Sequence, residues 1–239
     1  MRFGIRNSFD TMDQFEPRFR ECRTPIELAL PYRMTDYQQL RPHLAAVAAR
    51  LQEWGTPVLS VHAPQGRLQD ADFPVWATEV AQFAAALGVG EITLHPSRYA
   101  KDAPVFDLQR QVVLMLARLQ AQFPVTFALE TFEGGRRIFS PGDIMRLRLP
   151  MVLDVAHIRS HREVMAIVAE YQASIVTVHL SGKASGEHHL PIDGECLEVV
   201  RALRTRRWSG SVILEYLPAY HDRLKEDLAE LRGQFSREA

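Results

Sequence analysis

The sequence has few cysteines and no pattern that would make use of them. Its 239 residues include only Cys22 and Cys196, which lie far apart and in no C-x-x-C arrangement. A disulfide framework and a cysteine-based zinc site are therefore not expected, and the usage is typical of a reducing compartment.

Long apolar runs and an excess of charge are also lacking. No stretch approaches the roughly 18 apolar residues of a membrane span, and the first residues lack the apolar segment of a secretory signal, so we expect a cytoplasmic protein without a membrane partner. Lysine and arginine total 28 against 29 acidic residues, a formal charge of −1. Nucleic acid is a possible partner, but the net charge does not favour it and a local basic patch would be needed.

No linker rich in glycine, serine or proline divides the chain. Its composition, 46% hydrophobic and 24% charged, is that of an ordinary globular protein. We therefore expect residues 1–239 to form a single domain, and the length suits an α/β barrel of roughly 250 residues.

Apolar runs bounded by turn signals alternate with helical patterns along the chain. The runs predict eight buried strands, at 3–6, 26–30, 58–62, 91–95, 126–130, 152–154, 175–179 and 212–215. The helical patterns cover 11–23, 35–54, 72–87, 107–123, a short segment from 140, 162–171, 195–206 and 222–235. Strict alternation predicts parallel strands with right-handed crossovers, in either a closed barrel or an open doubly wound sheet.

Six consecutive predicted strands end in a side chain that can bind a metal or move a proton. They are His62, His95, Glu130, Asp154, His179 and Glu215. In an open sheet, six adjacent strands at about 4.8 Å spacing would spread these ends over roughly 24 Å. A closed barrel directs all six to one mouth, so the sequence predicts a (β/α)8 TIM barrel.

Carboxylates crowded at a barrel mouth repel one another unless a cation binds them. The mixture of imidazole and carboxylate suits zinc, manganese or iron better than calcium. His157 follows Asp154 by three residues, and the loop after the seventh strand adds Glu187 and His189. On an extended loop these two would project to the same side and could chelate one ion, the alternative being a solvated loop.

The loops expected at the mouth are rich in basic residues. These are Arg98, Lys101, Arg136, Arg137, Arg159, Arg162 and Lys183. Such a mouth would attract a small anionic substrate, most plausibly a phosphate ester, with Arg136, Arg137 and Lys183 as substrate-binding residues. Ordinary solvated side chains are the alternative interpretation.

From the third predicted strand onward, these metal-binding residues lie in short motifs whose order along the chain resembles that of the xylose isomerase-like barrel superfamily. They are His62-Ala63-Pro64, His95-Pro96, Leu129-Glu130-Thr131, Leu153-Asp154-Val155-Ala156-His157, Val178-His179-Leu180-Ser181, Glu187-His188-His189 and Leu214-Glu215. That group holds apurinic endonucleases of the endonuclease IV type and many sugar isomerases and epimerases.

The resemblance implies two ligand sets. In the isomerase branch one metal is held by four ligands, which match Glu130, Asp154, His179 and Glu215, and the two glutamates act as acid and base. In the endonuclease branch five further ligands, matching His62, His95, His157, Glu187 and His189, give three zinc ions. The first ion would then be held by His62, His95 and Glu130, the second by the central four residues, and the third by His157, Glu187 and His189.

The leading hypothesis is a phosphate-ester hydrolase with up to three zinc ions, in which Glu130, Glu215 and His157 act in catalysis. The alternative is a sugar or sugar-phosphate isomerase or epimerase with one ion, zinc, manganese or magnesium, in which His157 touches a substrate hydroxyl. A non-catalytic barrel that binds metal or sugar is the third hypothesis. The sequence departs from the endonuclease pattern at Glu187, where that family has aspartate, at Gln65, where it has tyrosine, and in a short loop after the second strand.

Overall fold

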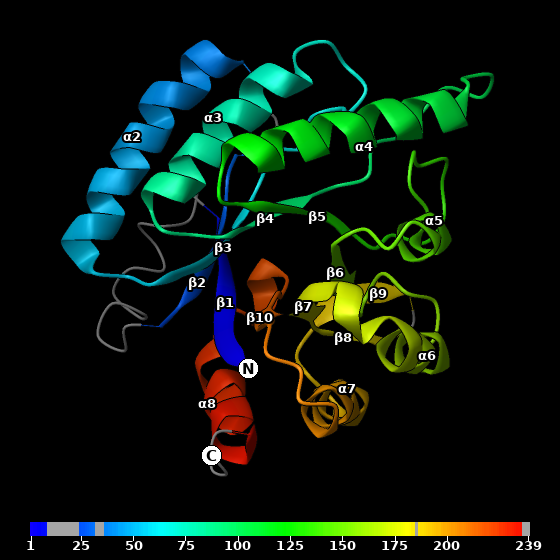
Figure 1. The fold of residues 1–239 in the computed structure, drawn as a ribbon. Coiled ribbons are helices and arrows are strands. Elements are labelled where there is room, and N and C mark those ends of the chain that lie inside the picture. Colours follow the sequence, from blue (N-terminus) through cyan, green and yellow to red (C-terminus); the bar gives the residue numbers. More distant parts are fainter. Residues whose placement is uncertain (9–23, 32–35, 185, 236–239) are drawn as a thin grey trace.

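Eight parallel strands close into a barrel in the computed structural model, which describes residues 1–8, 24–31, 36–184 and 186–235 (Figure 1). Around the barrel the strands follow the order β1-β10-β7-β6-β5-β4-β3-β2. Their bounds are β1 (Arg2–Ser8), β2 (Ile26–Ala29), β3 (Val58–His62), β4 (Glu91–Leu94), β5 (Thr126–Glu130), β6 (Met151–Asp154), β7 (Ile175–Leu180) and β10 (Ser211–Leu214). The predicted (β/α)8 barrel is confirmed, and the open sheet is excluded.

Helices surround the barrel and pack against their neighbours, α2 on α3 and α6 on α7 (Figure 1). They are α2 (Tyr37–Trp54), α3 (Phe73–Ala86), α4 (Val105–Gln122), α5 (Pro141–Arg146), α6 (His161–Tyr171), α7 (Gly194–Thr205) and α8 (Leu224–Phe235). Short 3₁₀ helices are also described, η2 (Gln172–Ser174) after α6 and η3 (Pro218–Tyr220) after β10. The helix predicted at 11–23 lies outside the described residues.

Side-chain caps fix where the helices begin. Asp36 accepts a hydrogen bond from the backbone of Gln38 at the start of α2, and Gly55, with φ 61°, ends that helix. Ser140 and Ser160 each form a capping box at the start of α5 and α6. The loops that lead from β5 and β6 into these helices, which border the barrel mouth, therefore end at defined points.

The barrel strands are largely buried and rich in apolar residues, as is usual for parallel strands covered by helices. Ile5, Leu28, Val61 and Ile92 are fully or almost fully buried, and Trp76 of α3 is among the largest buried side chains outside the sheet. None of the described helices is both long enough and apolar enough to cross a membrane.

The segment after β7 differs from the extended loop that the sequence suggested. It forms an antiparallel hairpin of β8 (Gly182–Ala184) and β9 (Glu187–Leu190). His189 has φ 59°, a left-handed conformation that is uncommon for a residue with a side chain. The alternation of side chains along β9 is therefore broken at the residue that was expected to be a ligand.

Candidate metal centre

The six side chains predicted at strand ends lie together at the barrel mouth. His62, Glu130 and Asp154 end β3, β5 and β6, and His179 lies one residue before the end of β7. His95 and Glu215 directly follow β4 and β10. With His157 and His189 they form three groups in which the ligand atoms all lie within 4.8 Å of one another: His62, His95, Glu130; Glu130, Asp154, His179, Glu215; and Asp154, His157, His189.

The first group is centred on one oxygen of Glu130. Oε2 of Glu130 lies 2.6 Å from Nε2 of His95 and 3.4 Å from Nε2 of His62. The two imidazole rings meet edge to face, with centroids 4.6 Å apart. Three donor atoms therefore converge on one point, as the ligands of a tetrahedral ion do.

The central group is built around Nδ1 of His179. This atom lies 3.0 Å from Oε1 of Glu130, 3.0 Å from Oε2 of Glu215 and 3.9 Å from Oδ2 of Asp154. One ring nitrogen carries at most one proton, so it cannot donate to all three carboxylates at once.

The third group differs from the one that the resemblance implied. His157 and His189 approach each other, with ring centroids 5.0 Å apart, and Nε2 of His157 lies 3.7 Å from Oδ2 of Asp154. Glu187 is exposed on β9 and belongs to none of the groups found among the described residues. The structure therefore does not bring Glu187 together with His157 and His189, because the left-handed backbone at His189 turns the two side chains apart.

Two buried carboxylate oxygens point to a cation. Oδ1 of Asp154 accepts hydrogen bonds from the backbone of Ala156 (2.8 Å) and His157 (3.1 Å). In contrast, Oδ2 of Asp154 is buried and accepts no hydrogen bond from any residue in the described part of the chain, and Oε2 of Glu215 is buried beside Nδ1 of His179, which it shares with Glu130. A buried acceptor without a partner is costly, and a bound divalent ion would satisfy both atoms. The residues present therefore fit a metal centre.

Burial and crowding also shift the pKa values of the acidic and imidazole side chains in these groups. Burial raises the pKa of Asp154 well above its usual value, and the charges of Glu130 and Glu215 add to the effect. Burial also opposes ionisation of Glu130, but His95 and His179 outweigh it and hold the pKa of Glu130 well below its usual value. Burial lowers the pKa of His157 to about 4, so this imidazole is neutral at physiological pH and able to bind a metal.

Sequence reasoning missed Glu27, a fully buried carboxylate on β2. Its Oε1 lies 2.8 Å from Nε2 of His179, on the side of the ring opposite the central group. Ser60 donates to Oε2 of Glu27 at 3.1 Å and Thr93 at 3.4 Å. Together with Glu215, Glu27 raises the pKa of His179 well above its usual value against the effect of burial. The signal in the sequence was a lone acid between Ile26 and Leu28 in an apolar strand.

Arg6 of β1 was also missed. Its Nη1 contacts Oε1 of Glu215. Burial alone would lower the pKa of Arg6, but the surrounding carboxylates, Glu215 first among them, outweigh burial and raise it. The same guanidinium, together with His179, lowers the pKa of Glu215 despite the burial of that carboxyl group. The central group therefore contains a fixed positive charge that pairs with one oxygen of Glu215 and leaves the other for a ligand.

The three predicted substrate-binding residues take different positions. Lys183 on β8 directs Nζ to the carbonyl oxygens of Ile158 and Val155, which ties the hairpin to the loop after β6. Arg136 is exposed and lines a large cavity between α4, α5 and α6. Arg137 packs its guanidinium 4.2 Å from the ring centroid of Phe132, the side chain that also contacts His95 and His157.

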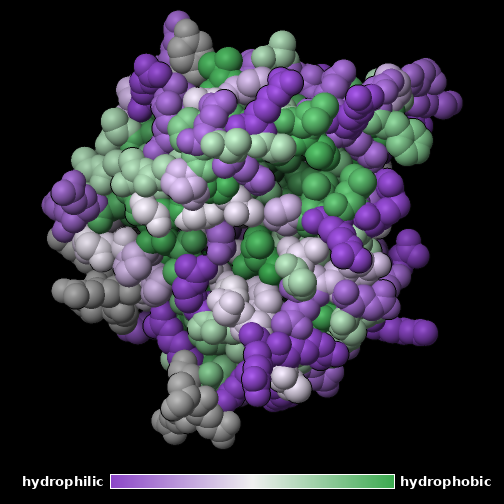
Figure 2. Space-filling view, viewed as in Figure 1, coloured by the Kyte–Doolittle hydropathy of each residue, from purple (hydrophilic) through white to green (hydrophobic). Residues whose placement is uncertain are grey.

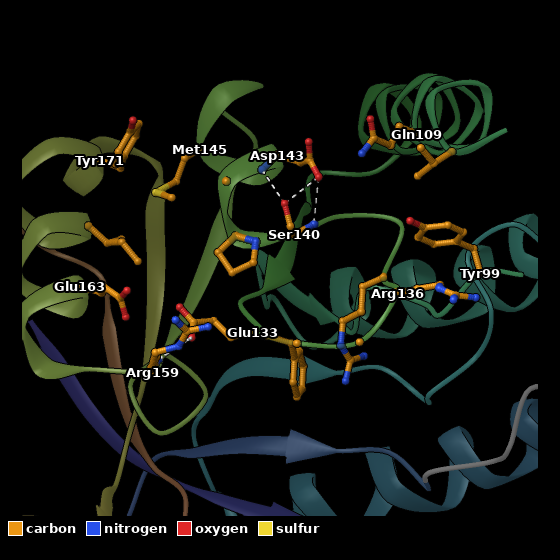
Figure 3. A pocket seen from close by; sticks show the side chains of 18 of the residues that line it. Tyr99, Gln109, Glu133, Arg136, Ser140, Asp143, Met145, Arg159, Glu163 and Tyr171 are labelled. Atoms are coloured by element: carbon orange, nitrogen blue, oxygen red, sulfur yellow. Dashed lines mark hydrogen bonds and ion pairs between the residues drawn. The ribbon is translucent and has the colours of Figure 1, made fainter. Parts of the chain in front are cut away.

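The large cavity has a volume of about 810 Å³ and borders the metal centre through Phe132. Figure 3 shows Tyr99 and Arg136 on one side, Tyr171, Glu163 and Arg159 on the other, and Ser140 and Asp143 between them. In Figure 2 apolar surface lies in a hollow beside α4, edged by hydrophilic groups. The wall of this cavity carries both acidic and basic side chains, so it is mixed in charge.

Comparison with solved structures confirms the resemblance at the level of the fold. The structure is similar to the 3-keto-D-glucoside 4-epimerase of E. coli, with a TM-score of 0.70, 16% identity, and 98% of this chain and 99% of that chain covered. It is similar to endonuclease IV from Thermus thermophilus (TM-score 0.62, 16% identity, 96% and 99% covered) and to the IolI protein with a bound zinc atom (TM-score 0.65, 13% identity, 99% and 96% covered). No protein-family model matches the sequence. No curated protein matches it either. The chain therefore shares the TIM barrel fold of these proteins.

Proposed function

We propose that the protein is a metal-dependent hydrolase of a phosphate ester with a three-ion centre. The observation that carries this proposal is the overlap of three ligand groups, in which Glu130 is shared by the first and second and Asp154 by the second and third. A single-ion enzyme needs only the central group and leaves His62, His95, His157 and His189 without a common purpose.

When bound, divalent ions lower the pKa of water toward neutrality and stabilise the charge that develops on phosphoryl oxygens. The chain's own residues supply the arrangement. Glu130 places its two oxygens toward different groups, Oε2 toward His95 and Oε1 toward His179. Asp154 is held by the backbone of Ala156 and His157 through Oδ1, which leaves Oδ2 directed at the mouth. Phe132 packs its ring beside those of His95 and His157.

The hydrolase proposal is tested with bis(p-nitrophenyl) phosphate and the zinc-loaded protein. His189→Ala removes one ligand of the third group and should lower kcat/KM at least about a hundredfold, because the ion that this group would hold is lost. His188→Ala is the matched control, since His188 is an exposed neighbour on the same strand and belongs to none of the ligand groups. Full activity of His189→Ala would contradict a role for the third group.

A sugar isomerase or epimerase is the second candidate. It is favoured by the central group, in which Glu130 and Glu215 each lie 3.0 Å from Nδ1 of His179 and supply two carboxylates, one able to accept a proton and the other to donate one. The fold likeness to a 3-keto-D-glucoside 4-epimerase is consistent with it. Isomerisation of a panel of ketoses and aldoses should survive His189→Ala, whereas phosphate-ester hydrolysis should not, so the one variant separates the two candidates.

A further inference from the structure

A second, smaller cavity adjoins the first ligand group and is lined by arginine. Its volume is about 490 Å³. Its wall consists of Gln65, Gly66, Arg67, His95, Pro96, Ser97, Arg98, Phe132 and Arg137. His95 is thus both a member of the first ligand group and part of the wall, so a molecule in this cavity would lie beside the metal centre.

Hydrogen bonds between three loops fix the wall of this cavity. Ser97 accepts from the backbone of Leu68 at 2.6 Å and, through its carbonyl oxygen, from the backbone of Ile138 at 2.8 Å. The side-chain amide of Gln69 donates to the carbonyl oxygen of Arg98 at 3.0 Å, and Arg98 forms an antiparallel bridge with Arg137. The loops that follow β3, β4 and β5 are therefore joined, and the site is organised before any ligand enters.

The charge of the smaller cavity is of one sign. Among the described residues, three arginines line it and no acidic residue does. Arg67 forms a long ion pair with Asp70, 3.7 Å from Nε to Oδ1, and both side chains are exposed, so this pair neutralises little of the charge of Arg67. The larger cavity is different, because its arginines are balanced by Glu133, Asp143, Glu163 and Glu170. An anionic group would therefore prefer the smaller cavity.

The position of Arg137 adds to this preference. Its Nη1 donates to the carbonyl oxygen of Pro96 at 3.0 Å and its guanidinium packs on Phe132, so this charge is held in place at the boundary of the two cavities. Arg67 and Arg98 are exposed and able to turn toward a ligand. Guanidinium groups bind phosphate through paired N–H donors, which makes a cavity of this kind suited to a phosphate rather than to a sugar hydroxyl.

We propose that the cavity between Arg67, Arg98 and Arg137 binds a phosphate group of the substrate other than the one that reacts. The substrate then carries two phosphoryl groups, one at the metal centre and one beside His95. The inference rests on the proposed function, because it assigns the cavity to the same substrate. A nucleotide chain and a sugar bisphosphate both have this chemistry.

The test uses metal-free protein, so that inorganic phosphate can bind to the arginine cavity but not to a metal ion. Binding of inorganic phosphate is measured by ³¹P NMR titration, with the folded state of each variant checked by circular dichroism. Arg67→Ala and Arg98→Ala should each weaken phosphate binding about tenfold, because each removes a charged hydrogen-bond donor from a water-exposed site. Arg201→Ala, an exposed arginine on α7 that lines neither cavity, is the charge-matched control and should bind as the unaltered protein does.

The inference is overturned if the unaltered metal-free protein does not bind phosphate, or if Arg67→Ala and Arg98→Ala bind it as tightly as Arg201→Ala. Failure of the proposed function gives a different pattern, namely arginine-dependent phosphate binding without zinc-dependent hydrolysis. A dinucleotide and a sugar bisphosphate distinguish the two sources of the second phosphate. The source is the substrate whose kcat/KM falls in Arg98→Ala.

Discussion

Glu27 sets the orientation of His179 from inside the barrel. The carboxylate accepts a hydrogen bond from Nε2 of His179 at 2.8 Å, and Ser60 and Thr93 donate to the same carboxylate. The other ring nitrogen of His179, Nδ1, therefore faces the mouth. Histidine ligands of metals usually make such a bond through the other ring nitrogen, which fixes the ring and its tautomer. Although Glu27 is not one of the grouped ligands, we expect it to affect the affinity of the central group for metal.

Glu27→Gln tests this expectation. The variant keeps the shape of the side chain but loses its charge, and zinc affinity should fall about 10- to 100-fold, the effect usual for such partners of metal ligands. The affinity is measured by competition with a chromophoric chelator. Glu198→Gln is the control, because Glu198 is an exposed carboxylate that pairs with a different histidine, His161. Equal zinc affinity in the two variants would contradict the assigned role of Glu27.

The ligand positions could be predicted at this scale because each lies at or next to the end of an apolar run. His62, Glu130 and Asp154 are examples in which the strand and its last residue follow directly from the sequence pattern. Glu27 and Arg6 could not be assigned in the same way. Each lies within a strand, and its role depends on a partner more than 150 positions away in sequence, His179 and Glu215 respectively.

The hairpin of β8 and β9 is the element that completes the third ligand group. It brings His189 to His157 and Asp154, and Lys183 fixes it to the loop after β6. At its base, a Cβ atom on Gly182 would lie 2.5 Å from the carbonyl oxygen of Pro191, closer than real contacts allow. Only glycine therefore lets β8 approach the residue that directly follows β9.

Gly182→Ala should displace the hairpin while the barrel remains folded. The crowded Cβ should cost about 1 to 3 kcal/mol of stability, and the shift of His189 should reduce bound zinc by one ion per chain. Thermal unfolding and metal analysis measure the two effects. Gly194→Ala is the control, because a Cβ there meets no atom within 4 Å and its φ is not positive. Zinc content equal to that of the control would count against the hairpin as a carrier of a ligand.

The sequence was informative about most elements and misleading about this one. Ser140 caps α5 through local hydrogen bonds, so the start of that helix could be predicted from the residues around it, and the predicted helix at 162–171 lies within one residue of α6. The hairpin depends on pairing between β8 and β9 and on the left-handed backbone of His189, neither of which leaves a local signal. For that reason the pairing of Glu187 with His189 on one face was expected, whereas the structure separates them.

Closure of the barrel turns separate strand ends into one centre. A chain with a formal charge of −1 places Glu130, Asp154 and Glu215 at one mouth and Glu27 inside the barrel beneath them, with Arg6 and His179 as the neighbouring positive groups. Around the same mouth the loops add arginines, which form the wall of the smaller cavity. The whole molecule thus combines an acidic interior that suits cations with a basic rim that suits anions.

The number of metal ions tests the central claim most directly. Crystals of the zinc-loaded protein, measured at the zinc absorption edge, should show three anomalous peaks at the barrel mouth. One peak should lie beside His62 and His95, one in the central group at His179, and one between His157 and His189. A single peak, confined to the group of Glu130, Asp154, His179 and Glu215, would contradict the three-ion hydrolase and favour the one-ion isomerase.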